Sequence, residues 1–358
     1  MDEKYWVGLK LIPPITQKFN QFLRQFGGAK EIWEASLSEL SQVVSLEVAQ
    51  KIVFQRNQVN LGEELERVKN HGARVLTVNS PEYPTLLQEI PSPPAALFIT
   101  GKNLKDFSPA IAIVGSRRAS TYGKALAEEF AAKLSEAGLT IVSGLARGID
   151  SAAHLGALRT GGETVGVLGC GLDVVYPAEN KKLYQQISEE GALVSEYPLG
   201  TPPLTFHFPS RNRIISGLSL GVIVVEANDR SGALITVDFA LEQGREVFAV
   251  PGNVKSTLSR GTHKLLKQGA SLVEKAEDVL EALNISSPEI SVRKESNQSD
   301  LSRDEKSLLE RVGWEVRHID EICRQVNQPI SQTSSLLTIL ELKGYIKQEA
   351  GQRYLRIQ

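Results

Sequence analysis

The segment Phe206–Ser219 (FHFPSRNRIISGLS) combines residue types that bind single-stranded nucleic acid. Aromatic rings stack on bases and guanidinium groups pair with phosphates. Phe208 is therefore the candidate stacking residue, and Arg211 and Arg213 are the candidate phosphate contacts. Asn212 is a further candidate, which could instead brace the loop through backbone hydrogen bonds. The competing interpretation is a loop whose arginines pair with acidic residues.

A second cluster of similar chemistry lies far upstream, at a predicted strand-to-helix turn. Gly115 permits a sharp turn, and Ser116 with the following backbone N–H groups can face an anion at the helix start. Arg117 and Arg118 add guanidinium groups that can contact phosphate. The segment has neither the dinucleotide-binding nor the P-loop glycine pattern. It therefore predicts a phosphate ligand that is not a nucleotide cofactor.

Three further turns carry candidate contacts. Gly144, within 143–150, allows a ligand to approach the backbone, although a purely structural turn explains it equally well. Lys181 could reach phosphate, against the alternative of a solvated lysine on a helix surface. Ser231 and Gly232 open a predicted helix at a strand end and resemble an anion cradle.

No catalytic constellation accompanies these candidates. The five histidines have no metal-ligand spacing, and His154 lies among small apolar residues, as a packed core histidine does. Glu196 and Glu226 follow predicted strands, where they could form a carboxylate pair. We favour the alternative that they hold the loop arginines. The sequence thus predicts no catalytic residue, no metal and no cofactor.

Composition places few limits on the partner. The 358 residues are 41% hydrophobic and carry a net charge near −2, so an anionic ligand must be held by a local patch. Cys170 and Cys323 have no metal-ligand spacing and fit a reducing cytoplasm. The N-terminus is acidic and polar, unlike a signal peptide. The longest apolar runs fall far short of the roughly 20 residues that span a bilayer.

The candidates are positioned by alternating strands and helices. Apolar runs such as Ile111–Val114 alternate with amphipathic segments such as Tyr122–Ala137, up to a last helix at Glu277–Leu283. This alternation predicts an α/β domain over 66–285 with a doubly wound, mostly parallel, Rossmann-like sheet. A helix is expected over Arg211–Gly217. Ligands of such sheets bind beyond the carboxyl ends of the strands.

Smaller modules flank this domain. Residues 1–65 read as a module of short helices, and 286–302 is rich in Ser, Pro and charge, as a linker is. Residues 303–358 read as three helices and a hairpin, the winged-helix layout. The recognition helix would be Ser331–Lys343, which has one basic residue near its end. It can therefore serve DNA binding or contact with a protein.

The motifs, in their order, resemble the DprA/Smf family of DNA-processing proteins of bacterial natural transformation. The resemblance covers the whole α/β domain, with weaker similarity in the C-terminal module. It also implies that residues 1–65 form a SAM/HhH-like module. It rests on GSRRAS (115–120), SGLARGID (143–150), GCGLDVVYPAEN (169–180), FHFPSRNRIISGLS (206–219), EANDRSGALIT (226–236) and VFAVPG (247–252).

The resemblance implies a protein that binds incoming single-stranded DNA, protects it and loads the RecA recombinase. It also implies a cytoplasmic homodimer formed through the α/β domain, without nucleotide cofactor or membrane contact. Family members often have lysine three residues before the groove phenylalanine, where this chain has Thr205. Together with the residue chemistry above, it gives these candidate DNA contacts: Gly115, Ser116, Arg117, Arg118, Gly144, Lys181, Phe208, Arg211, Asn212, Arg213, Ser231 and Gly232.

Two rival hypotheses stay open at this point. The domain also resembles nucleotide phosphoribohydrolases of the related Rossmann superfamily, although Pro251-Gly252-Asn253 lacks their second glycine and their glutamate is absent. The other rival is a protein-interaction scaffold in which the winged helix is the working part.

Overall fold

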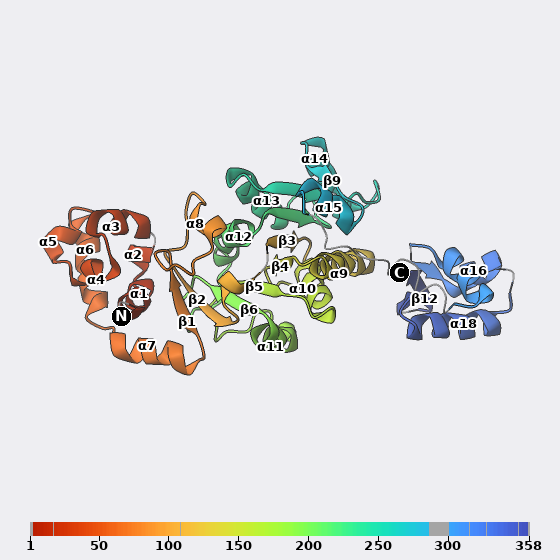
Figure 1. Cartoon of the computed structure of the whole chain (residues 1–358), viewed down its shortest axis with the longest axis horizontal. Helices are drawn as coiled ribbons and strands as arrows, with labels where there is room; N and C mark the ends of the chain where they lie inside the picture. Colours follow the sequence, from red (N-terminus) through yellow and green to blue (C-terminus); the bar gives the residue numbers. More distant parts are fainter. Residues whose placement is uncertain are drawn as a thin grey trace.

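The chain folds into three bodies arranged in a row (Figure 1). A computed structural model describes residues 3–16, 18–107, 109–285, 301–314, 316–326, 328–349 and 351–356. An N-terminal group of helices packs beside a central α/β body, and a small helical body lies at the far end. Residues 286–300 of the predicted linker lie outside the described residues.

The N-terminal body consists of short helices, as predicted, around an apolar cluster that also includes Ala95 and Ala96 of the central body. Gly27 ends one of them with a left-handed backbone (φ 82°), a conformation that glycine adopts without strain. Fully buried side chains such as Leu9, Ile32 and Ile52 pack together. The helices are α1 (Glu3–Lys10), α2 (Pro13–Thr16), α3 (Phe19–Phe26), α4 (Ala29–Glu34), α5 (Leu37–Leu40), α6 (Leu46–Arg56) and α7 (Leu61–Asn70).

The central body contains one mostly parallel sheet, which confirms the predicted fold class. Within the described residues, nine strands run in the order β1-β2-β6-β5-β4-β3-β7-β8-β9. Pairs β1–β2 and β2–β6 are antiparallel, and the other neighbours are parallel. The strands are β1 (Arg74–Thr77), β2 (Ala96–Gly101), β3 (Ala110–Val114), β4 (Thr140–Ser143), β5 (Thr164–Leu168), β6 (Ala192–Ser195), β7 (Gly221–Val224), β8 (Glu246–Ala249) and β9 (Ser271–Leu272).

Helices cover both faces of this sheet because every central strand is apolar on both sides. In β3, Ala112 and Val114 face one core, and Ile111 and Ile113 face the other. The helical elements are α8 (Thr85–Gln88), η1 (Leu104–Asp106), α9 (Thr121–Glu136), α10 (Ile149–Arg159), η2 (Ala178–Asn180), α11 (Lys181–Glu190), α12 (His207–Gly217), α13 (Ala233–Glu242), η3 (Thr257–Ser259), α14 (Arg260–Lys267) and α15 (Ala276–Ala282). Helices α8, α12, α13 and α14 contribute to the core that contains Ala112 and Val114. Helices α9, α10 and α15 contribute to the core that contains Ile111 and Ile113.

The strand order reverses direction at β3, and this reversal locates the ligand crevice. From β3 the chain proceeds to β4, β5 and β6 on one side and to β7, β8 and β9 on the other. At such a switch point the connections leave in opposite directions and open a crevice at the carboxyl ends of the strands. The turns after β3, β4 and β7 meet there.

The C-terminal body has the predicted winged-helix layout. Helices α16 (Arg303–Val312), α17 (Ile319–Val326) and α18 (Ile330–Leu342) pack on a small antiparallel sheet in the order β10-β12-β11. The strands are β10 (Arg317–His318), β11 (Ile346–Glu349) and β12 (Arg353–Arg356). The exposed residues of α18 carry no charge; they are Ile330, Ser331, Gln332, Ser335, Thr338, Ile339 and Leu342. Such a face suits protein contact at least as well as base readout, which normally uses Arg, Lys, Asn or Gln.

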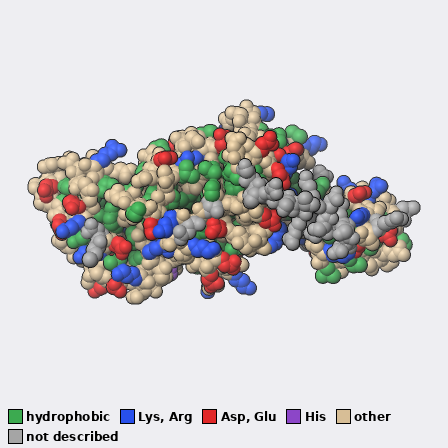
Figure 2. Space-filling view, viewed as in Figure 1, with side chains coloured by type: hydrophobic (Ala, Val, Ile, Leu, Met, Phe, Trp, Pro, Cys, Tyr) green, Lys and Arg blue, Asp and Glu red, His purple; other side chains and the backbone are tan. Residues whose placement is uncertain are grey.

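The surface shows no single-sign field on the face seen in Figure 2, where Lys and Arg side chains lie interspersed with Asp and Glu side chains. This matches the net charge of −2. None of the helices in the described part of the chain is long and apolar enough to cross a bilayer.

Candidate nucleic-acid interface

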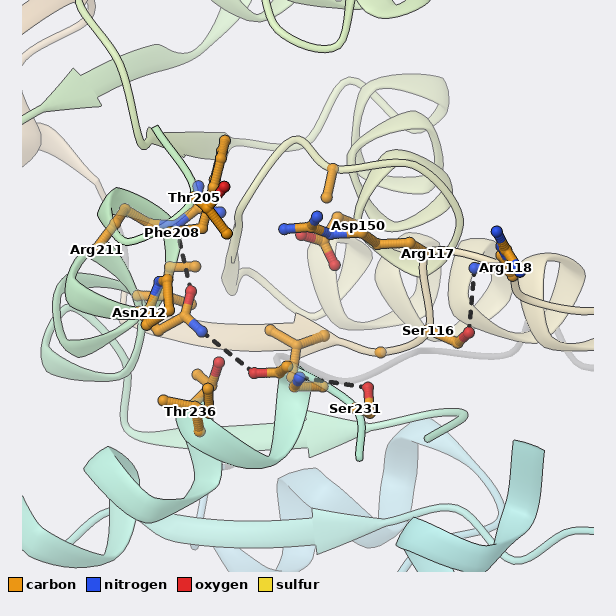
Figure 3. Close-up of a pocket in the computed structure, with 18 of the residues that line it drawn as sticks. Ser116, Arg117, Arg118, Asp150, Thr205, Phe208, Arg211, Asn212, Ser231 and Thr236 are labelled. Atoms are coloured by element: carbon orange, nitrogen blue, oxygen red, sulfur yellow. Dashed lines mark hydrogen bonds between the residues drawn. The ribbon is translucent and has the colours of Figure 1, made fainter. Parts of the chain in front are cut away.

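A cavity of about 550 Å³ opens at the switch point (Figure 3), and we call it the edge groove. Its walls come from the β3–α9 turn, the start of α10, helix α12 with the segment that leads into it, and the start of α13. The lining residues are Val114, Gly115, Ser116, Arg117, Arg118, Ala146, Asp150, Tyr176, Pro203, Thr205, Phe208, Pro209, Arg211, Asn212, Ile215, Asn228, Ser231, Gly232, Ala233, Ile235 and Thr236.

Most of the predicted contacts meet in this one groove. Nine of the twelve candidates are among its lining residues: Gly115, Ser116, Arg117, Arg118, Phe208, Arg211, Asn212, Ser231 and Gly232. Gly144 lines a small adjoining cavity that shares Arg117 and Phe208 with the groove. Lys181 and Arg213 line neither cavity.

Phe208 forms an oriented aromatic surface in the wall of the groove. Its ring lies 5.3 Å from the Tyr176 ring between centroids, at an interplanar angle of 36°. The guanidinium carbons of Arg117 and Arg211 lie 5.2 and 5.9 Å from its centroid, within cation–π range. The ring also packs against Gly169, where a Cβ atom would come within 2.8 Å of it. Phe208 is therefore packed beside two cations.

Arg117 is the cation best placed to bind a ligand. Figure 3 shows its side chain extending into the groove beside Asp150, whereas Arg118 lies at the outer edge. Both arginines are exposed, while Ser116 is buried. The backbone N–H of Ser116 donates to the Glu226 carbonyl at 2.7 Å, and its hydroxyl accepts from the Arg118 N–H at 3.1 Å. Ser116 therefore shapes the turn that presents the two guanidinium groups.

Arg211 differs from the prediction, because its side chain is buried instead of free for a phosphate. It is 3% exposed, and its Nη1 donates to the Gly144 carbonyl at 2.8 Å and also to the Val167 carbonyl. Burial lowers the pKa of Arg211 to about 10, against the attraction of Asp150, so it is still a cation at neutral pH. Arg211 thus ties α12 to the ends of β4 and β5.

The reason lies in where α12 begins. The helix starts at His207 and not at the expected Arg211, so Phe208 and Arg211 lie three positions apart on the same helix. Residues at this spacing share a face. The face that carries Phe208 into the groove wall therefore also turns Arg211 toward the strand ends.

Burial raises the pKa of Asp150, the acidic neighbour of Arg211, although Arg211 opposes this shift.

Arg213 also differs from the prediction, since it is an ion-pair partner. Its Nη2 lies 2.6 Å from Glu196 Oε2, and Glu196 Oε1 lies 3.0 Å from Lys10 Nζ. The side chains of Arg213, Glu196 and Lys10 are 17%, 19% and 4% exposed. The expectation that Glu196 holds a loop arginine is confirmed. Lys10 of α1 was missed, because no local pattern links it to a residue 186 positions away.

The pKa values in this cluster follow from burial and pairing. Burial alone would raise the pKa of Glu196, but Lys10 and Arg213 lower it by more, so the pKa lies below its ordinary value. Burial lowers the pKa of Lys10, although Glu196 opposes that shift. The cluster joins the N-terminal body to α12, which carries Phe208.

Of the remaining candidates, Asn212 and Ser231 form hydrogen bonds within the protein, whereas Lys181 is exposed. The Asn212 amide donates to the Gly232 carbonyl at 3.3 Å and its oxygen accepts from Arg211 Nε at 3.3 Å, so Asn212 braces α12 against the start of α13. Ser231 accepts a hydrogen bond from the Ala233 N–H at 3.3 Å. Lys181 is an exposed residue at the start of α11, consistent with the alternative of a solvated lysine.

Glu226 has a different role from the one that the sequence suggested, and Tyr176 is a groove residue that was not among the candidates. Glu226 binds Ser120 through its carboxylate instead of holding an arginine. Tyr176 packs on the candidate stacking residue, and the sequence signal for it was its place in the glycine-rich segment 169–180. His154 is fully buried, as expected, with Nδ1 2.7 Å from the Thr164 hydroxyl. The described part of the chain contains no cluster of potential metal ligands.

Comparison with known families identifies both folded parts beyond the N-terminal body. Residues 74–284 match the family described as DNA recombination-mediator protein A. Residues 292–352 match the DprA winged helix domain. The first match covers the whole edge groove, and its description, a recombination mediator, favours the non-enzymatic hypothesis over a phosphoribohydrolase.

Individual relatives cover most of the chain. Protein Smf of Escherichia coli is 41% identical over 340 residues, which span 91% of this chain and 90% of that protein. The DNA processing protein DprA of Streptococcus pneumoniae is 43% identical over 252 residues, 70% of this chain and 87% of that one.

Solved structures are similar as well. The X-ray structure of DNA processing protein A (DprA) from Streptococcus pneumoniae has a TM-score of 0.69 at 40% identity, covering 76% of this chain and 95% of that one. A structure of the Helicobacter pylori protein, described for its unique single-stranded DNA binding mode, has a TM-score of 0.54 at 31% identity, covering 59% and 95%. The match over 74–284 and the relatives that span both proteins establish the conclusion: this chain belongs to the DNA recombination-mediator protein A family, also named DprA or Smf.

Proposed function

We propose that this protein binds single-stranded DNA in the edge groove, protects it, and loads a RecA-type recombinase on it during natural transformation. The observation that carries the proposal is the oriented Phe208 ring beside the exposed Arg117 at the switch point. A base can stack on an aromatic ring while a guanidinium group pairs with the adjacent phosphate. The Helicobacter pylori relative, described as a single-stranded DNA binder, supports this assignment.

The proposed contacts are narrower than the residue chemistry alone suggested. Arg117 and Arg118 contact phosphates and Phe208 stacks a base, whereas Arg211, Asn212 and Arg213 hold these groups in place. Recognition through stacking and phosphates carries little sequence preference. The description of the family as a recombination mediator supports the transfer of bound DNA to a recombinase.

Salt dependence tests the DNA-binding part of the proposal. Each phosphate neutralised on a single strand contributes a slope of about −0.7 to log K against log salt. With two or three phosphate contacts we expect a slope between about −1.4 and −2.1. Fluorescence anisotropy with a labelled oligothymidylate measures it. Affinity that is indifferent to salt would contradict a phosphate-contacting groove.

The recombinase part is tested separately. RecA filament growth on an oligonucleotide coated with single-strand-binding protein is measured with and without this protein. We expect faster filament growth with the wild type and no acceleration with Phe208→Ala. Equal acceleration by both would place recombinase loading outside the edge groove.

We further propose that the protein acts in the cytoplasm as a homodimer through the α/β body, with β9 in the contact. This strand is an edge of the sheet, and its Leu272 side chain is 53% exposed. An edge strand offers unpaired backbone groups to a second copy. Leu272→Lys is expected to convert dimer to monomer in sedimentation velocity, whereas Leu155→Lys, an exposed leucine on α10, leaves the dimer intact. A Leu272→Lys protein with the wild-type mass rules out this edge.

A further inference from the structure

The turn that follows β3 is closed by a carboxylate from the neighbouring strand. Glu226 lies two residues beyond the end of the parallel strand β7 and is 9% exposed. Its Oε2 accepts from the Ser120 N–H at 2.8 Å, and its Oε1 accepts from the Ser120 hydroxyl at 2.6 Å. Both carboxylate oxygens are thus used within the protein.

This carboxylate lies against the first turn of α9. Ser120 is the N-cap of that 16-residue helix, and its hydroxyl accepts from the Gly123 N–H at 2.9 Å. A Cβ atom on Gly123 would lie 2.4 Å from Glu226 Cδ, so only glycine allows so close an approach. Glu349 of β11 contacts the hydroxyl of Thr121, the first residue of the helix.

The place that Glu226 occupies is the one that a phosphate takes in many α/β proteins. A helix that follows a strand at the switch point directs its free N–H groups and its positive dipole end toward the crevice. A nucleotide phosphate normally satisfies those groups. Here the Glu226 carboxylate lies at the helix start instead, where it accepts from the N–H and the hydroxyl of the N-cap residue Ser120. Its negative charge repels a second anion from this position.

The cations of the groove lie outside this position. Arg117 and Arg118 are exposed residues on the turn before Ser120, and Arg117 extends into the groove beside Phe208. A phosphodiester, which carries one negative charge, can meet Arg117 without entering the helix start. A terminal phosphate monoester carries nearly two charges at neutral pH and gains most from the enclosed position.

We propose that Glu226 is a specificity-determining residue that restricts the edge groove to the interior of a nucleic-acid strand. Its carboxylate fills the start of α9 and so excludes free nucleotides and terminal phosphates, while the exposed arginines hold phosphodiesters. This inference rests on the proposed function for the strand, but the exclusion of nucleotides is measured independently of it.

The test compares the wild type with Glu226→Ala, Glu226→Gln, and Glu226→Ala combined with Glu349→Gln. Binding of deoxythymidine monophosphate and of inorganic phosphate is measured by calorimetry. Competition is measured against a labelled oligothymidylate without terminal phosphates. Glu136→Gln, an exposed residue at the far end of α9, matches the charge change outside the groove.

The wild type and Glu136→Gln are expected to bind the oligonucleotide and to give no saturable binding of the mononucleotide. The Glu226→Ala proteins are expected to gain at least about tenfold in mononucleotide affinity, which corresponds to about 1.4 kcal/mol. The mononucleotide then competes with the oligonucleotide. A gain of affinity cannot arise from partial unfolding, so it separates this role from a purely structural one.

Two results would overturn the inference: folded Glu226 variants that bind mononucleotide no better than the wild type, or a wild type that binds it as tightly as the oligonucleotide. Glu226→Gln keeps the side-chain volume and one hydrogen-bond acceptor. If the alanine proteins do not fold, mononucleotide binding by Glu226→Gln is the measurement that tests the inference. A wild type that fails to bind the oligonucleotide would refute the proposed function and leave the nucleotide comparison intact.

Discussion

Replacing Arg117 and Phe208 together by alanine is expected to weaken single-stranded DNA binding by about 100-fold or more. Stacking on an aromatic side chain contributes about 1–3 kcal/mol per base. A hydrogen bond to a charged group contributes about 1.5–3 kcal/mol. The guanidinium carbon of Arg117 lies 5.2 Å from the centroid of the Phe208 ring, and both residues line one groove, so a single strand can contact both. Anisotropy titration at low salt measures the loss, together with each single variant.

The choice of residues in this experiment depends on the structure. Arg211→Ala would remove the donor to the Gly144 and Val167 carbonyls, so a loss of binding could reflect damage to the fold. Arg117 is exposed, and its removal leaves the core intact. Arg159→Ala is the matched control, because Arg159 is exposed at the opposite end of α10. A folded double variant whose affinity stays within about threefold of the wild type, less than 1 kcal/mol, would refute the assigned groove.

Replacing Glu196 by alanine is expected to lower the free energy of unfolding by about 2–4 kcal/mol. Breaking a buried ion pair typically costs about 3–5 kcal/mol because a charge is left without its partner. Here two cations, Lys10 and Arg213, lose the same carboxylate. The side chains of Glu196 and Arg213 are 19% and 17% exposed, so water compensates part of the loss. Urea unfolding measures the change.

Controls separate this effect from a general loss of charge. Glu189→Ala removes an exposed carboxylate on α11 and is expected to change stability by less than about 0.5 kcal/mol. Hydrogen exchange should rise in α1 and α12, the two helices that the cluster joins. If the Glu196→Ala protein has the same hydrogen exchange in α1 and α12 and the same free energy of unfolding as the wild type, the ion-pair cluster is not a structural link between the two helices.

The effect of Glu196 also has a predicted pH dependence. Because its pKa in the folded protein lies below the ordinary value of 4.5, its contribution is fully present above that pH. The contribution is lost as the pH falls through the folded pKa. The stability difference between the wild type and Glu196→Gln should therefore shrink under acid conditions. A difference that grows on acidification would contradict the pairing.

Much of the architecture could be read locally. The apolar run at Ile111–Val114 is buried on both faces, and runs of this kind predict a central parallel strand. The glycine and arginine residues that follow such strands were expected at the carboxyl edge, and Gly115 and Arg117 lie there. One helix boundary was not predicted: α12 begins at His207, four residues before the expected start. Pro209 does not prevent this, because proline is compatible with the first turn of a helix.

The sequence by itself determined the alternation of strands and helices, the family, and the turns that carry candidate contacts. Only the tertiary structure decided which charges are available. Arg211 and Arg213 resemble Arg117 in sequence, yet one is held by strand-end carbonyls and the other by Glu196. Burial and pairing depend on residues far away along the chain, such as Lys10. Local residue patterns contain no information about partners that are brought together only when the sheet and the N-terminal body pack.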